Sequence, residues 1–191
     1  MRFVEIKSCE QQAALILHRV RLMLMRQRTQ LSNAIRGHMA EYGLVAALIN
    51  EQVLENDRHI RTSARATELG RRLMEVPGVG PLLASAMVAA VPDPRAFKCG
   101  RSLAAWIGLV PRQNSSGGKE KLGGITKQGD RYLRQLLVVG AIAVIRYAQR
   151  HGTRRPWLVK LLARRTPKIA AVALANKTAR VTRARRVSGQ R

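Results

Sequence analysis

The chain has 191 residues, of which 46% are hydrophobic and 4% aromatic, and it carries 35 Lys and Arg residues against 11 Asp and Glu residues. The hydrophobic content excludes a chain that is disordered throughout. The formal net charge of +24 makes nucleic acid the default partner, with a basic membrane-surface protein as the alternative. Few aromatic residues and many Ala and Leu favour packed helices over a β-sandwich, so we expect a mainly α (all-α) fold.

Several further classes of protein are disfavoured by the sequence. The apolar run Leu136–Ile145 is too short to span a bilayer, and no signal peptide precedes the first predicted helix, so we expect a cytoplasmic protein that does not bind membranes. Cys9 and Cys99 lack metal-type spacing and are expected to stay reduced. No metal site is expected, because no ligand-type pair occurs among the four histidines, His18, His38, His59 and His151.

The N-terminal part of the chain predicts two long helices. Ser8 and Gln11 form a capping box, after which apolar residues recur at spacings of three, four and seven. Gly37 and Gly43 allow this helix to end, and a second helix is predicted over about Val45–Arg61. We expect residues 1–65 to form a coiled-coil-like helical hairpin. Its apolar stripes either join copies of the chain into a homo-oligomer or pack only within one chain.

A glycine-containing turn separates the next two predicted helices, over residues 69–91. Pro77 to Gly80 form a tight turn in LMEVPGVGPLLASAMV, and Pro81 occupies the first turn of the following helix. Backbone N–H groups and the helix dipole at such a turn can hold a phosphate without reading sequence. The pattern resembles the helix-hairpin-helix of DNA-binding proteins and makes Gly78 and Gly80 candidate DNA-binding residues. The alternative is a purely steric role for both glycines.

The remaining helices are predicted on either side of a loop over residues 108–130. A short apolar helix is expected at Ser102–Leu109, before the loop, and Asp130 is expected to cap a helix over Arg131–Arg150. A short helix at Trp157–Arg165 and a last helix starting near Pro167 complete a compact helical domain over residues 66–180. No strand signal stands out.

The end of the chain is basic. Asp130 is the last acidic residue, and the sequence ends in RVTRARRVSGQR. Like-charged ends of this kind are usually solvated nucleic-acid arms. We therefore expect residues 181–191 to form a disordered basic tail, which either binds nucleic acid or contacts nothing specific.

The loop over residues 108–130 combines serine, glycine and cations. A serine hydroxyl can attack a phosphodiester when cations offset the phosphate charge. Ser115 and Ser116 precede two glycines, which allow the backbone to approach a duplex closely. The cations of this stretch are Arg112, Lys119, Lys121, Lys127, Arg131 and Arg134. On spacing alone, a solvated turn or a phosphate-binding loop without chemistry fits as well.

The whole run from Leu73 to Ala141 closely resembles the C-terminal transposase domain of the insertion-sequence-110 family, the bridge-RNA-guided serine recombinases of bacterial mobile elements. The earlier segment EQQAALILHRVRLMLMRQRTQLSNAIRGHMAEYG resembles the coiled-coil segment of that family, and WLVKLLARRTPKIAAVALANKTAR resembles the end of its transposase domain. The resemblance covers about residues 3–180.

The resemblance implies a function in DNA transposition and site-specific recombination. In the family, a serine before the glycines of this loop becomes covalently joined to DNA. Ser116, directly before Gly117, matches that position, and Ser115 is the fallback. DNA and a guide RNA are the partners implied, with a location at the bacterial nucleoid.

The chain departs from the family pattern in its acidic residues. The family has an N-terminal RuvC-like domain with four acidic metal ligands, whereas the 11 acids here are scattered. We therefore expect no cofactor in this chain, with Mg²⁺ bound only by the missing domain, and a truncated chain that needs the acidic site of a partner subunit. The alternative function is a catalytically inactive nucleic-acid-binding remnant of a transposase. A basic structural protein is the third reading.

Overall fold

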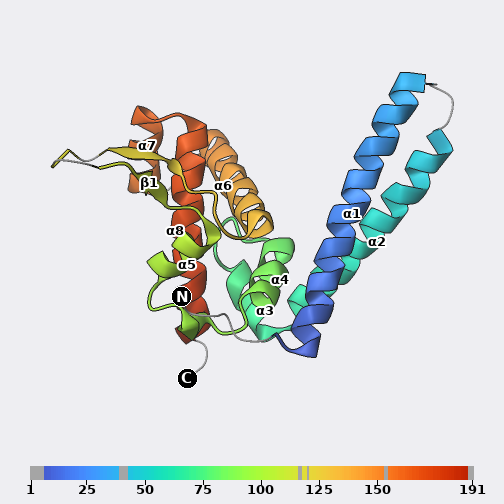
Figure 1. Ribbon diagram of the computed structural model, residues 1–191, viewed down its shortest axis with the longest axis horizontal. Helices are drawn as coiled ribbons and strands as arrows, with labels where there is room; N and C mark the ends of the chain where they lie inside the picture. The colour runs from blue at the N-terminus through green and yellow to red at the C-terminus, as the bar shows by residue number, and fades with distance from the viewer. Residues whose placement is uncertain (1–6, 39–42, 116–117, 120, 153–154, 189–191) are drawn as a thin grey trace.

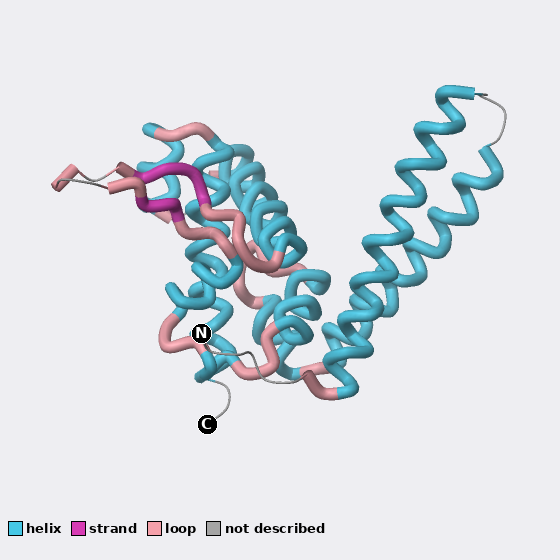
Figure 2. The backbone as a smooth tube through the Cα atoms, viewed as in Figure 1, coloured by secondary structure: helices cyan, strands magenta, loops and turns pink. Residues whose placement is uncertain are grey.

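The fold consists of helices joined by short connections, with one small pair of strands (Figures 1 and 2). The computed structural model describes residues 7–38, 43–115, 118–119, 121–152 and 155–188. The elements in chain order are α1 (Cys9–His38), α2 (Gly43–Ala66), α3 (Glu68–Met74), α4 (Pro81–Ala90), η1 (Pro94–Ala96), α5 (Gly100–Ile107), β1 (Pro111–Gln113), β2 (Leu122–Ile125), α6 (Arg131–His151), α7 (Pro156–Arg164) and α8 (Pro167–Ser188). The predicted mainly α class is confirmed.

Helices α1 and α2 lie antiparallel and form a long hairpin that projects from the other helices (Figure 1). The capping box forms as predicted, because the Ser8 N–H donates to Gln11 Oε1 at 3.0 Å and the Gln11 N–H donates to Ser8 Oγ at 3.3 Å. At the base of the hairpin both helices contact α4. Along it, Ile16, Met23 and Leu54 remain more than half exposed, so the hairpin does not bury all of its apolar surface within this chain.

Helix α8 is the central element of the remaining helices and contacts α3, η1, α5, α6 and α7. Its inner face consists largely of alanine, and such small side chains let neighbouring helices approach closely. Helix α6 packs against it with apolar residues spaced four apart, which form one helix face. The buried apolar residues of the two helices include Ala170, Ala171, Leu174, Ala175 and Ala179 on α8 and Leu133, Leu137, Ala141 and Ile145 on α6.

The basic end of the chain is helical, so the predicted disordered tail over residues 181–191 is wrong for residues 181–188. Helix α8 continues to Ser188, and the Arg186 side chain is buried. Arg186 donates from Nη1 to the carbonyl oxygen of Met87 at 3.0 Å and from Nη2 to that of Pro92 at 3.2 Å. Carbonyls at the end of a helix lack partners within it. The guanidinium therefore satisfies groups at the end of α4, and residues 189–191 lie outside the described residues.

The structure also contains strands that the sequence did not predict. Strands β1 and β2 pair antiparallel, with Pro111 opposite Ile125 and Gln113 opposite Leu122. The predicted loop over residues 108–130 is thus a ribbon with a paired base. The first-turn prolines at positions 81 and 167 and the Asp130 cap are confirmed.

We predict that Arg186→Leu destabilises the fold more than Arg185→Leu. The first change removes the Arg186 donor from the carbonyls of Met87 and Pro92, and Met87 keeps only the Val91 N–H, so the free energy of unfolding falls by about 2 kcal/mol. Arg185 pairs with an exposed Glu75, and losing that pair costs about 0.5 kcal/mol. Urea denaturation of both variants measures the difference. Equal losses would show that the Arg186 contacts contribute no more to stability than the exposed Arg185–Glu75 pair.

Candidate nucleic-acid interface

The ribbon, whose described residues are 111–115, 118–119 and 121–125, extends from the body of the protein into solvent (Figures 1 and 2). Every described residue from Pro111 to Gly124 is exposed. Beyond the strands, the Asn114 N–H donates to the carbonyl of Lys121 at 2.8 Å, so the pairing continues toward the tip. The ribbon is therefore open on its surface but ordered by its own backbone.

The base of the ribbon is fixed by contacts with α5 and α6. The Thr126 N–H donates to the carbonyl of Val110 at 2.9 Å, and Arg134 donates to the carbonyl of Ile107 at 2.8 Å. Gly129 has a φ of +89°, and a Cβ there would lie 1.8 Å from the carbonyl oxygen of Trp106. Only glycine fits this position, so the returning strand passes directly against the end of α5.

Helix α6 starts immediately after this base. The Asp130 carboxylate caps it by accepting from the Leu133 N–H at 2.9 Å. Arg131 is exposed in the first turn. The direction of α6, and with it the packing against α8, is thereby linked to the position of the ribbon.

Of the two candidate nucleophiles, Ser115 alone is among the described residues. Ser116 lies outside the described residues, as does Glu120, the carboxylate nearest to it in sequence. Ser115 is exposed, and its Oγ accepts a hydrogen bond from the Lys121 N–H at 3.2 Å. The described structure thus gives the Ser115 hydroxyl a backbone partner across the ribbon.

The candidate phosphate-binding cations fall into two groups. Arg112, Lys119 and Lys121 are exposed on the ribbon, and Lys127 is exposed at its base. Arg134 is half-buried and holds the ribbon base through the carbonyls of Ile107 and Gln128. The ribbon cations are therefore accessible to a polyanion, whereas Arg134 has a structural role that its place in the sequence did not reveal.

The two glycines of the turn before α4 have different surroundings. Gly78 packs against Gly140 of α6, where a Cβ on Gly140 would lie 2.0 Å from the Gly78 carbonyl oxygen. Gly80 is exposed, precedes the first turn of α4 and has open space at its Cβ position. The steric alternative thus describes Gly78, and Gly80 alone presents an open backbone. Within the described residues neither strand of the ribbon contacts α3 or α4.

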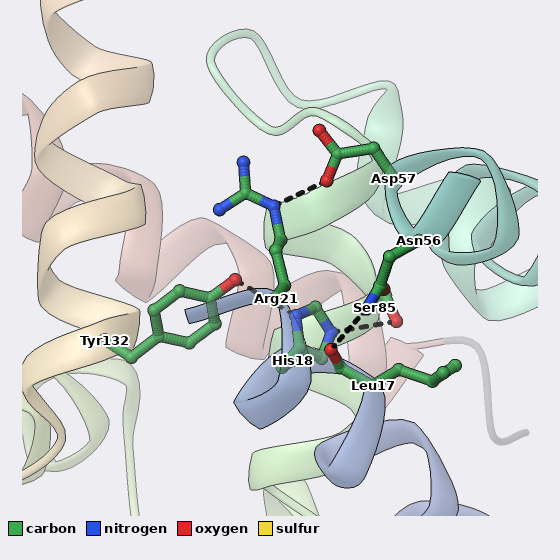
Figure 3. Close-up of polar contacts among 7 residues, drawn as sticks. All are labelled: Leu17, His18, Arg21, Asn56, Asp57, Ser85 and Tyr132. Atoms are coloured by element: carbon green, nitrogen blue, oxygen red, sulfur yellow. Dashed lines mark hydrogen bonds and ion pairs between the residues drawn. The ribbon is translucent and has the colours of Figure 1, made fainter. Parts of the chain in front are cut away.

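A buried polar cluster joins the hairpin to α4 and α6 (Figure 3). His18 of α1 is 2% exposed, its Nδ1 lies 3.1 Å from the Tyr132 hydroxyl, and its Nε2 lies 3.2 Å from Ser85 Oγ. Beside it, Arg21 Nε lies 2.6 Å from an Asp57 carboxylate oxygen, an ion pair between α1 and α2. Since Tyr132 lies in the first turn of α6, the cluster connects the hairpin to the helix that begins at the ribbon base. Its interhelical contacts gave no local sequence signal.

Burial keeps the His18 ring of this cluster neutral. Burial, with a smaller effect of the Arg21 charge, lowers the pKa of His18 to about 4, so its ring is neutral at pH 7. Burial also raises the pKa of Tyr132. Both ring nitrogens of His18 have hydroxyl partners, and the ring therefore holds helices together.

Metal-binding groups are not gathered in the described part of the chain. No group of three or more His, Cys, Asp or Glu side chains there is placed to hold a metal ion. Both cysteines are free and exposed. None of the helices in the described segments is long and apolar enough to cross a membrane.

Comparisons with known proteins match nearly the whole chain to transposases. The model of the IS116/IS110/IS902 transposase family matches residues 70–155. A transposase of Sinorhizobium fredii is 41% identical over 100% of this chain and 59% of its own length. A family 20 transposase of Pseudomonas aeruginosa is 42% identical over 95% of this chain and 65% of its own length. A transposase for insertion sequence element IS1111A of Coxiella burnetii is 37% identical over 94% of this chain and 60% of its own length. The chain thus spans about three fifths of the length of these curated relatives.

We predict that His18 makes stability depend on pH. Its pKa in the folded chain, about 4, lies below the usual 6.5, so the unfolded chain binds the extra proton between these values. The contribution of His18 to the free energy of unfolding is fully present above pH 6.5. It is lost as the pH falls toward 4, and the loss amounts to up to about 3 kcal/mol. Unfolding measured from pH 4 to 7 should show this slope in the wild type and a shallower one in His18→Gln. Parallel slopes would refute it.

Proposed function

The chain belongs to the IS116/IS110/IS902 family of transposases, and on this premise we propose that it acts in DNA transposition, binding DNA through the ribbon and joining Ser116 to a DNA phosphodiester. The observation that carries the proposal is the exposure of the glycine-rich ribbon on a fixed base. A protruding ribbon can enter a groove of a duplex, while its base keeps its direction constant.

The proposed step is a transfer of a phosphodiester to the protein. The serine oxygen attacks the phosphorus, a serine–phosphate bond forms, and the bond to the 3′ oxygen breaks. The hydroxyl proton of the serine leaves its oxygen, and the 3′ oxygen takes up a proton as it departs as a hydroxyl. Attack by another 3′ hydroxyl reverses the step and rejoins strands, so the bond energy is conserved without ATP.

The cations of the ribbon supply the electrostatic part of this step. Negative charge grows on the phosphate oxygens in the transition state, and positive groups held nearby stabilise it. Arg112, Lys119 and Lys121 are the described residues available for this role. The described acids form no cluster that fits Mg²⁺. A separate acidic domain would hold it.

A second candidate function is binding without chemistry. It is favoured by one observation, which is that the Ser115 hydroxyl accepts a hydrogen bond from the Lys121 backbone N–H. In that case the exposed cations of the ribbon bind nucleic acid, and no covalent bond to DNA forms. In both cases we propose that the exposed apolar residues Ile16, Met23 and Leu54 of the hairpin join copies of the chain. A guide RNA is a further proposed partner.

We predict a covalent protein–DNA adduct that depends on Ser116. The chain is mixed with supercoiled DNA of an element end, with and without a separately supplied acidic domain, Mg²⁺ and guide RNA, and is then denatured. An adduct is expected when the acidic domain is present, and it should be lost in Ser116→Ala because the attacking oxygen is gone.

The matched control is Ser115→Ala, which should retain the adduct. Loss with Ser115→Ala alone would move the nucleophile by one residue. The lack of an adduct under every condition, with DNA binding retained, would favour the binding function without chemistry.

We predict that the ribbon cations set the salt dependence of DNA binding. Each phosphate neutralised contributes about 0.9 to the slope of log K against log salt concentration. Changing Arg112, Lys119 and Lys121 together to Gln should therefore make this negative slope shallower by about 2 to 3. Changing Arg58, Arg61 and Arg65 of α2 to Gln removes the same charge from the hairpin and is the control. Equal changes in slope would mean that overall charge, and not the ribbon, binds DNA.

A further inference from the structure

A second basic surface lies between α5, α7 and α8, apart from the ribbon. It is a groove of about 670 Å³ that begins at Cys99 and Arg101 near the start of α5 and runs between Trp157 of α7 and Lys177 and Arg180 of α8. The mechanism proposed above uses none of these residues. The groove therefore needs its own explanation.

The Lys and Arg residues that line the groove give it positive charge. Arg101, Lys177 and Arg180 are exposed, and no acidic residue is among the described residues that line the groove. Within the described segments, none of these three cations forms an ion pair with a carboxylate. Three cations facing one concave surface attract a polyanion.

One end of the groove favours negative charge locally. The Cys99 sulfur lies 3.5 Å from Ser102 Oγ. The pKa of its thiol is lowered to about 7 by the Ser102 hydroxyl, by the backbone N–H groups of Ser102 and Arg101, and by the Arg101 charge. The Ser102 hydroxyl and the Arg101 charge, at the start of α5, would also attract a phosphate oxygen placed there, whereas the Ser102 N–H already donates to the Cys99 carbonyl at 3.1 Å.

An aromatic ring lies at the other wall. Trp157 is 38% exposed, and the Lys177 ammonium lies over its ring, 4.7 Å from the centroid, so a base that stacks on this face displaces the ammonium toward a phosphate. Duplex DNA offers phosphates to such a surface but keeps the faces of its bases stacked, so it does not use a tryptophan ring. An unpaired base stacks on an aromatic ring, and single-strand-binding proteins combine such rings with a cationic groove.

We propose that the groove between α5, α7 and α8 binds single-stranded nucleic acid, with phosphates at Arg101, Lys177 and Arg180 and an unpaired base on Trp157. The proposal rests on the function proposed above and extends it, because exchange of DNA strands requires unpaired segments. Single-stranded DNA and RNA share the chemistry that the groove recognises, and the experiment below compares them.

The first test is fluorescence titration in a Ser116→Ala, Trp106→Phe background, which leaves Trp157 as the fluorophore. Oligothymidylate and oligouridylate of about 12 nucleotides are the probes, within the site sizes of single-strand-binding folds. Both should quench the fluorescence. Arg101→Gln with Arg180→Gln should weaken binding about 10-fold more than the control pair Arg61→Gln with Arg65→Gln. Equal weakening, or binding without quenching, would overturn the proposal.

The second test uses the two cysteines as internal probes. Both are exposed, but Cys99 lines the groove and Cys9 lies at the start of α1. Oligothymidylate should slow alkylation of Cys99 several-fold and leave Cys9 unchanged, as read by peptide mass spectrometry. A duplex of the same length, and oligothymidylate with Trp157→Leu, should protect Cys99 less. Equal protection by duplex and single strand would overturn the proposal.

These results are separable from the serine chemistry. Since the background lacks Ser116, single-strand binding is measured without any covalent step. Loss of groove binding with the Ser116 adduct intact would reject the groove alone. Groove binding without an adduct would reject the serine chemistry alone.

Discussion

The junction at the ribbon base is the constraint on which the rest of the structure depends. There the chain leaves α5, runs out along β1, returns along β2 and starts α6, and the two passages are held together by Gly129 against Trp106 and by Arg134 on the carbonyl of Ile107. Because α6 packs on α8, the ribbon is anchored to the core. Because Tyr132 of α6 contacts His18, the hairpin is anchored to the same helix. An exposed, glycine-rich segment thus has a defined direction relative to both.

Features that depend on neighbours within one turn could be predicted from the sequence. The Ser8 capping box, the Asp130 cap and the prolines that begin α4 and α8 are of this kind, since each is a local match between side chain and backbone. The mainly α class followed from composition in the same way. The cations of the ribbon could be named because exposure of lysine and arginine in a glycine-rich segment requires no tertiary information.

Features that depend on distant contacts could not be predicted. Strands β1 and β2 are short, exposed and without alternation, and their pairing depends on the junction with α5. At the end of α8, one buried face contains Ala175, Ala179, Thr182 and Arg186, but the high net charge hid this spacing. The carbonyl partners of Arg186 lie 99 and 94 residues earlier in the chain. His18 was hidden likewise, since its partners come from α4 and α6. The role of Ser116 rests on resemblance alone, because it lies outside the described residues.

Binding of DNA by the ribbon can be measured by amide hydrogen exchange of the whole chain, read by mass spectrometry, with and without a duplex from an element end. The account predicts that the duplex slows exchange across the ribbon, residues 111–125, and leaves the outer part of the α1–α2 hairpin unchanged. Unchanged exchange in the ribbon, with protection confined to the hairpin, would contradict the claim that the ribbon is the DNA-binding element of this protein.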